Sequence, residues 1–166
     1  GNDEVDWTDQ RAAITVKHQR SMHDANTDVF YLESTALMYA SHGGHVDCVY
    51  ALLEANTNVN YANMLGFTAL MYASQNGHAS CVYALQAMSD VNQANARGKT
   101  SLMVASQNNH AQCVAMLLLD TKTEIEQVDT CGKTALHWAS IGGAVDCVFA
   151  LVTAKANVNH LDRNGG

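Results

Sequence analysis

The chain has 166 residues and a mean hydropathy of -0.11, and its 48% apolar and 15% charged residues suit one folded domain or a short array of small units. No apolar run approaches the roughly 18 residues of a membrane-spanning helix, so we expect no membrane contact. The formal charge of -7 argues against binding to a nucleic-acid backbone, because that binding depends on cationic surface.

The chain begins with Gly1 to Glu4, which carry no basic and apolar leader, so we expect no secretory signal. Its five cysteines are an odd number, which favours reduced thiols over a disulfide framework. Both features favour a cytoplasmic or nuclear protein, which we expect to be monomeric.

Residues 1–33 carry an incomplete copy of a pattern that recurs regularly in the rest of the chain. Thr8 and His18 have the relative spacing of a Thr and a His that recur later, but Thr8 precedes Thr35 by only 27 residues. Residues 19–24 also lack the apolar stripe of a second helix. We expect residues 1–33 to form either a degenerate capping repeat or an irregular extension, because terminal repeats are usually atypical.

Residues 34–166 contain four copies of one pattern. The segment that begins at Thr35 recurs in closely similar form at Thr68, Thr100 and Thr134, at intervals of 33, 32 and 34 residues. In every copy a Cys-Val pair follows the Thr by 13 residues and a Leu follows it by 17. A period of this kind predicts a stack of small units. We place the units at residues 34–62, 63–94, 95–128 and 129–161, with another turn begun at 162–166.

Each unit is expected to contain two short helices. The Thr at the start of each copy is a good N-cap, and Gly44, Gly77, Asn109 and Gly143 are suited to end the first helix in a left-handed conformation. A second helix is expected after His45 and its equivalents. Each helix is about two turns long and too short to be stable alone, so its stability must come from stacking on neighbouring units.

The links between units begin with Asn or Asp and have Gly in fourth place, which is typical of a type I turn. A unit of about 33 residues with this turn and two helices, carrying T-x-L-x-x-A, G-H, C-V-x-x-L and V-N, resembles the ankyrin repeat. The resemblance covers about three quarters of the chain. It implies an all-α solenoid of helix-turn-helix units with short β-turn hairpins. One departure is that Met38, Met71 and Met103 replace the family's His after the Leu, which weakens a hydrogen-bond network but keeps the apolar stacking.

Catalytic and metal sites are not expected. His45 and Cys48 lie three residues apart, as do their equivalents in the next two copies, and both residue types are good zinc ligands. The fourth copy, however, has Ala144 in place of the His, and the Cys shares a stripe with Val and Leu, so we interpret the Cys as a packing residue. No nucleophile elbow, phosphate-binding loop or H-E-x-x-H occurs, so we expect neither an enzyme nor a cofactor.

The resemblance implies binding of a protein partner through the turn tips and the concave surface of the first helices. Residues at these positions pass from apolar to basic along the tips. They are Tyr31, Leu32, Met64, Leu65, Phe67, Arg97, Lys99 and Lys133 at the tips, and His42, Gln75, Asn76, Gln107, Asn108 and Ile141 at the helix ends. We therefore expect a scaffold or adaptor module that grips an apolar anchor followed by acidic residues. A different interpretation is that the apolar tip packs against residues 1–33.

Three further possibilities remain open. A few ankyrin domains bind a small molecule or an oligonucleotide, which is the alternative function for this chain. Asn60 and Asn159 lie in V-N motifs of the kind that asparaginyl hydroxylases modify in this family. Finally, Tyr50, Tyr83 and Phe149 fall at an outer position of the second helix and are expected to be exposed, as a second contact face or as tolerated surface aromatics.

Overall fold

The computed structural model of the chain describes residues 34–163. Within this range the chain forms eight helices and no strand, which confirms the predicted all-α solenoid. Each repeat contributes a first helix and a second helix. The pairs are α2 (Ala36–Gly43) with α3 (Val46–Glu54), α4 (Ala69–Gln75) with α5 (Ala79–Gln86), α6 (Ser101–Gln107) with α7 (Ala111–Leu119), and α8 (Ala135–Ile141) with α9 (Val145–Thr153).

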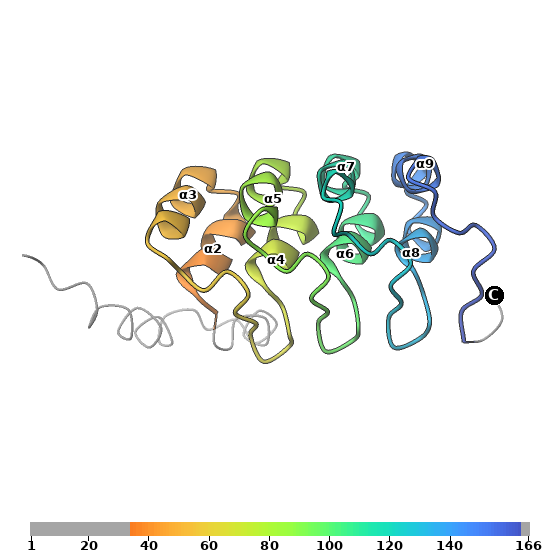
Figure 1. Ribbon diagram of the computed structural model, residues 1–166, viewed down its shortest axis with the longest axis horizontal. Helices are drawn as coiled ribbons and strands as arrows, with labels where there is room; N and C mark the ends of the chain where they lie inside the picture. The colour runs from red at the N-terminus through yellow and green to blue at the C-terminus, as the bar shows by residue number, and fades with distance from the viewer. Residues whose placement is uncertain (1–33, 164–166) are drawn as a thin grey trace, which may run out of the picture.

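The helices stack in two layers along the length of the molecule. The first helices form one layer and the second helices form the other, and hairpins extend from the layer of first helices (Figure 1). Each helix contacts the equivalent helix of the neighbouring repeat and the other helix of its own repeat. Among residues 34–163 no helix has both the length and the apolar character needed to cross a bilayer.

The first helices begin at the predicted Thr caps. The hydroxyl oxygen of Thr35 accepts a hydrogen bond from the backbone N of Met38 at 3.3 Å, and the caps of the next two repeats repeat this contact. In the fourth repeat His137 replaces the Met, and its Nδ1 lies 2.9 Å from the Thr134 hydroxyl. His137 therefore reinforces the Thr134 cap in this repeat, whereas Met38 is buried in the core of the stack.

The first helices end in the predicted left-handed conformation, and this conformation also makes room for the next repeat. Gly44 has a φ of 72°, and a Cβ at this position would lie 2.6 Å from Nδ1 of His78. His78 in turn donates from Nε2 to the backbone oxygen of His42 at 2.9 Å. The Gly of one repeat and the His of the next repeat therefore form a single contact between the two units.

The core is continuous from repeat to repeat. Val49, Val82 and Val114 of the second helices are fully buried, as are Cys81 and its equivalents Cys113 and Cys147. Cys48, the equivalent cysteine of the first described repeat, is exposed. Residues 34–163 hold no group of three or more side chains that could bind a metal ion, and the buried cysteines act as packing residues.

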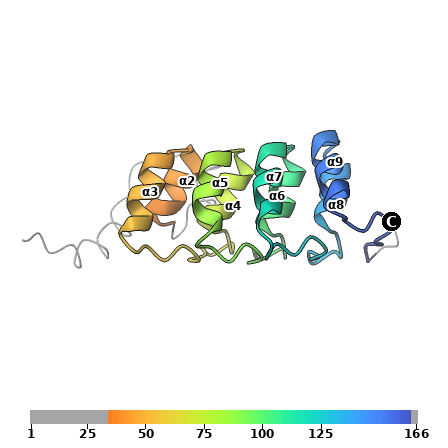
Figure 2. The ribbon, with the colours of Figure 1, turned by 45° about the horizontal axis from the view of Figure 1, so that its top comes forward.

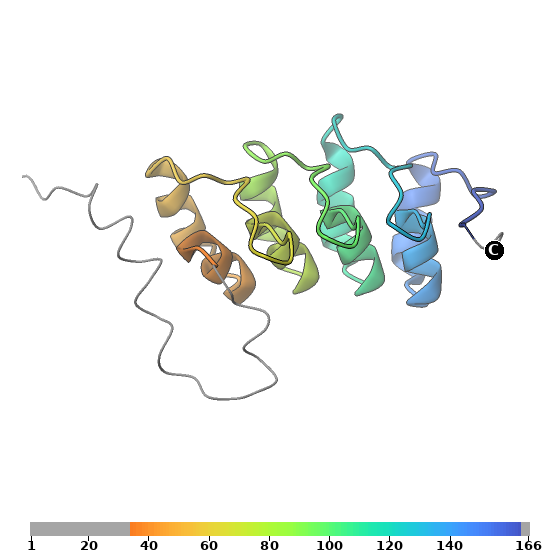
Figure 3. The same cartoon turned by 90° about the horizontal axis from the view of Figure 1, so that it is seen from below.

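The hairpins are held by the side chain at the start of each turn. Oδ1 of Asn63 accepts hydrogen bonds from the backbone N of Leu65 at 3.0 Å and of Phe67 at 2.9 Å, and Gly66 N donates to Asn63 O at 2.8 Å. This last bond is that of the predicted turn. Neighbouring tips are also joined, since Ala96 N donates to Leu65 O at 3.1 Å. Seen from below, the hairpins form a row along the stack (Figure 3).

Candidate functional site

The apolar end of the predicted tip row lies on the hairpin that leads into α4. Met64 is 66% exposed, whereas Leu65 and Phe67 are half-buried. The Phe67 ring packs against the buried ring of Tyr72, with 5.3 Å between ring centroids. Phe67 therefore anchors the hairpin to α4, and Met64 is the apolar side chain of the hairpin that is exposed to solvent.

A polar network joins the same hairpin to the ends of α2 and α4. The Tyr72 hydroxyl accepts a hydrogen bond from Nδ2 of Asn63 at 2.9 Å, and the His42 ring meets the Tyr72 ring edge to face. The side-chain amide of Asn76 lies 2.9 Å from Nδ1 of His42. Burial, and to a smaller extent the neighbouring His78, lowers the pKa of His42. His42 and Asn76 are thus held in place at the ends of α2 and α4.

The basic part of the row is less exposed than the sequence suggested. Lys99 is only 8% exposed, and its Nζ lies 2.6 Å from Oε1 of Gln107 and 3.2 Å from the ring centroid of Trp138. Burial lowers the pKa of Lys99, against the opposing effect of Asp129. Lys99 therefore lies inside the stack and not on the exposed tip row, because the indole of the next repeat covers its side chain.

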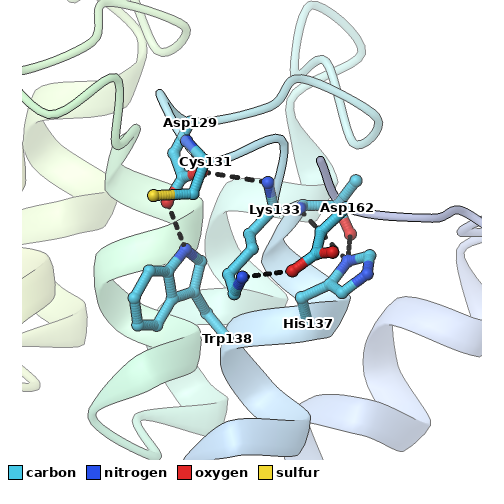
Figure 4. Close-up of polar contacts among 7 residues, drawn as sticks. Asp129, Cys131, Lys133, His137, Trp138 and Asp162 are labelled. Atoms are coloured by element: carbon cyan, nitrogen blue, oxygen red, sulfur yellow. Dashed lines mark hydrogen bonds and ion pairs between the residues drawn. The ribbon is translucent and has the colours of Figure 1, made fainter. Parts of the chain in front are cut away.

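Lys133 is also engaged within the chain. Its Nζ pairs with the carboxylate of Asp162, and this hydrogen bond is the main cause of the raised pKa of Lys133 (Figure 4). In the same cluster Nε1 of Trp138 donates to Oδ2 of Asp129 at 3.1 Å. Arg97 remains as an exposed cation on the tip of the third repeat.

The ends of the first helices show a similar division. Ile141 is 60% exposed, and Gln107 and Asn108 are exposed beside it along the stack. Asn108 donates from Nδ2 to the backbone oxygen of Val104 at 2.8 Å, so its side chain closes the end of α6. Gln75 is half-buried. Tyr31 and Leu32 lie outside the described residues, as does the segment 1–33 that could have covered the apolar tip.

The repeat architecture is matched by comparison with known families. The model of the family described as ankyrin repeats (3 copies) matches residues 12–95 and again residues 81–162. This chain belongs to the ankyrin repeat family. No curated protein matches it. Ankyrin repeats are in general protein-protein interaction modules, and the family is typically non-enzymatic.

Two asparagines of the ankyrin V-N motif differ in their surroundings. Oδ1 of Asn60 accepts a hydrogen bond from the backbone N of Asp90 in the next repeat at 2.8 Å. Asn159 is exposed, and its backbone N donates to Oδ1 of Asn157 at 3.0 Å. The Asn60 side chain thus joins two ankyrin repeats, while hydroxylation at either position stays a prediction.

Two surface depressions of the ankyrin stack lie away from the tip row. The larger of two described depressions holds about 540 Å³ and opens widely to solvent. It is lined by Thr123, Glu124, Ile125, Glu126, Gln127 and Lys155. Its two carboxylates give it a charge that opposes a phosphate ligand.

The sequence did not reveal the cluster of Lys99, Trp138 and Asp129. Position 138 is equivalent to Tyr39 and Tyr72, and helical spacing alone predicts an inter-repeat packing role for an aromatic ring at these positions. That expectation holds for Tyr72, which is 2% exposed, but Tyr39 is 44% exposed. A sequence signal for the cluster exists only in combination, because it requires both the Lys on the third ankyrin tip and the Trp on the first helix of the following repeat.

Proposed function

We propose that this ankyrin stack binds a protein segment through Met64 and Arg97, with an apolar side chain of the partner against Met64 and an acidic group beside Arg97. The observation that carries the proposal is the 66% exposure of Met64 at the end of a hairpin whose backbone is fixed at several points. An apolar side chain held out by a rigid backbone loses little conformational entropy when a partner covers it.

Arg97 lies one tip further along the stack. The hydrogen bond from Ala96 N to Leu65 O joins the two turns, so the apolar tip and the Arg97 turn form one continuous edge. Because Lys99 and Lys133 are engaged inside the chain, the acidic part of the partner would depend chiefly on Arg97. A charge at the rim acts mainly on specificity and on the rate of association.

The test compares proteins captured from a cell lysate by the parent chain with those captured by two single variants. Met64→Ser and Arg97→Gln should each weaken capture of the same partner, and the Arg97→Gln loss should shrink at high salt. Phe67 is left intact, since its ring supports the hairpin. Thr130 occupies the position of Met64 on the fourth tip, so Thr130→Ala serves as the matched control and should leave capture unchanged.

The affinity of the captured partner is then measured by titration against the same four proteins. We expect Met64→Ser to weaken binding by about tenfold, as for an interface anchor. Equal affinity for the parent and Met64→Ser would refute the apolar tip, and equal affinity for the parent and Arg97→Gln would refute the acidic contact.

A further inference from the structure

A second surface lies on the side of the stack that faces away from the hairpins. The second helices α3, α5, α7 and α9 lie next to one another along the whole described length, opposite the hairpin tips (Figures 1 and 2). Each of them presents one equivalent residue outward. We call these four residues the outer row: Tyr50, Tyr83, Ala115 and Phe149.

The outer row lies outside the buried core of the stack. The preceding residue on each of the first three second helices is Val49, Val82 or Val114, and these valines are completely buried between repeats. Tyr50, Tyr83 and Phe149 are 46%, 60% and 68% exposed. Large exposed aromatic side chains that recur along one face mark an interaction surface, because aromatic residues are the preferred anchors of protein interfaces.

The apolar character of this face extends beyond the aromatics. Val145 lies one turn before Phe149 on α9 and is 61% exposed. Leu119, at the end of α7, is 67% exposed. The exposed apolar area therefore continues over the third and fourth repeats, where Ala115 interrupts the aromatic residues.

The charges carried by the second helices themselves all have one sign. None of the four second helices between Val46 and Thr153 contains Lys or Arg. Asp47 precedes Tyr50 by three residues and Glu54 follows it by four, so both carboxylates share its helix face. Asp146 precedes Phe149 by the same three residues. Acidic groups thus flank both ends of the row, and its middle is uncharged.

The spacing of the row matches that of an α-helix laid across the repeats. Packed helices lie about 8–10 Å apart, which sets the step from one second helix to the next. Seven residues of a partner helix make nearly two turns and rise about 10.5 Å. Side chains seven residues apart therefore lie on one face of that helix, at nearly the spacing of the second helices. Three such steps separate the four positions from Tyr50 to Phe149, so a partner helix that reaches both ends needs about 22 residues or more.

We propose that the outer row binds an amphipathic helix of about 22 residues or more from a partner protein, with apolar side chains at seven-residue intervals and Lys or Arg near both ends. The apolar side chains lie against Tyr50, Tyr83 and Phe149. The cations at the two ends meet Asp47 and Glu54 on α3 and Asp146 on α9. Because it uses the opposite side of the stack, this surface does not depend on the proposed tip site.

The probe is a synthetic helical peptide of about 24 residues, with four Leu at seven-residue intervals and Lys near both ends. A twin peptide has Glu in place of each Lys. Binding of the fluorescently labelled peptides to the whole chain is followed by anisotropy at low salt. We expect the Lys peptide to bind at least tenfold more tightly than its Glu twin, because charge complementarity decides between partners at such a surface.

Two variants locate the binding site. Tyr83→Ser combined with Phe149→Ser should weaken binding of the Lys peptide by about tenfold or more. Ala115→Tyr fills the gap in the outer row and should tighten binding, a gain that a folding defect would not produce. Met64→Ser is the matched control on the opposite side of the stack and should bind the peptide as the parent does.

Several results would overturn the proposal. The helix assignment is wrong if the Lys peptide fails to bind the parent, binds no better than its Glu twin, or binds the double variant and the parent equally. If light scattering shows that the parent is a dimer and the double variant is a monomer, the row would instead bind a second copy of the chain. Sedimentation of the parent, but not of the double variant, with vesicles of phosphatidylserine and phosphatidylcholine would assign it to a membrane surface.

Discussion

The ammonium of Lys99 lies 3.2 Å from the centre of the Trp138 ring, so that a cation from the third repeat is covered by an indole from the fourth. The same indole donates to Oδ2 of Asp129 through Nε1. Trp138 therefore holds a positive group at its face and a negative group at its edge. This arrangement suits the quadrupole of an aromatic ring, whose face is negative and whose edge is positive.

A double-mutant cycle measures the free energy of this contact. Lys99→Met keeps the apolar stem and removes the charge, and Trp138→Leu removes the ring. We expect a coupling of about 1–2 kcal/mol in the free energy of urea unfolding, because the pair is largely desolvated. The matched control cycle uses Lys133→Met in place of Lys99→Met, because Lys133 pairs with Asp162. A coupling as small as that of the control cycle would contradict the stacked geometry.

Two glycines separate the contribution of the backbone from that of the contact between repeats. Gly77 and Gly143 both have positive φ, 77° and 64°. A Cβ on Gly77 would lie 2.6 Å from Nδ1 of His110, whereas a Cβ on Gly143 would meet nothing within 4 Å. Gly143→Ala should cost about 1 kcal/mol for the left-handed backbone alone. Gly77→Ala should cost about 1–3 kcal/mol more, because it also displaces the next repeat.

Urea unfolding of the two Ala variants at neutral pH gives both values. The prediction concerns the difference between the two losses in the free energy of unfolding. The parent and Gly143→Ala together therefore serve as the reference for Gly77→Ala. Equal destabilisation by the two substitutions would show that the His110 ring moves aside without loss. The contact between the Gly of one repeat and the His of the next would then contribute nothing to stacking.

The elements that the sequence predicted correctly depend on short-range signals. The Thr caps, the left-handed helix ends and the tip turns each require a particular residue within about four positions, and the structure has each of them. The exposure of Tyr50, Tyr83 and Phe149 followed equally from helical spacing and is confirmed. Stacking of equivalent units then determined the remainder of the fold.

The candidate site could not be predicted to the same depth. Arg97 and Lys99 lie two residues apart in one turn and are both cationic, yet Arg97 is exposed and Lys99 is buried. The difference arises from Trp138, which belongs to the following repeat. Likewise, Phe67 and Met64 are both apolar, and only the contact with Tyr72 distinguishes the supporting ring from the exposed side chain. These distinctions are tertiary, so local patterns do not contain them.

Protonation of His42 should destabilise the stack in mild acid. Burial and the neighbouring His78 lower the pKa of His42 below its ordinary value of 6.5. Below pH 6.5 the unfolded chain therefore binds a proton that the folded chain resists, and the free energy of unfolding falls as the pH falls. We expect His42→Gln to have a shallower loss of stability between pH 7.5 and 5.5 than the parent, as measured by urea unfolding. An identical pH dependence in both proteins would contradict this assignment.

The five thiols should fall into two classes of reactivity. Cys81, Cys113 and Cys147 are fully buried, and burial, with a smaller effect of the other two cysteines, raises the pKa of Cys113 to about 11. Only the thiolate attacks a disulfide reagent, so a buried thiol with a raised pKa reacts slowly at pH 8. Cys48 and Cys131 are exposed. We expect two thiols to react rapidly with an aromatic disulfide reagent and three to react only as the chain unfolds.

Variants and denaturant identify the two classes. Cys131→Ser should remove one rapid thiol and leave the slow ones unchanged, whereas Cys113→Ala should remove one slow thiol. Addition of urea above the unfolding midpoint should merge all the thiols into the rapid class, because unfolding removes both the burial and the shift in pKa. More than two rapid thiols in the folded parent would mean that the second helices separate readily. The repeats would then be held together far less tightly than their buried Val and Cys side chains indicate.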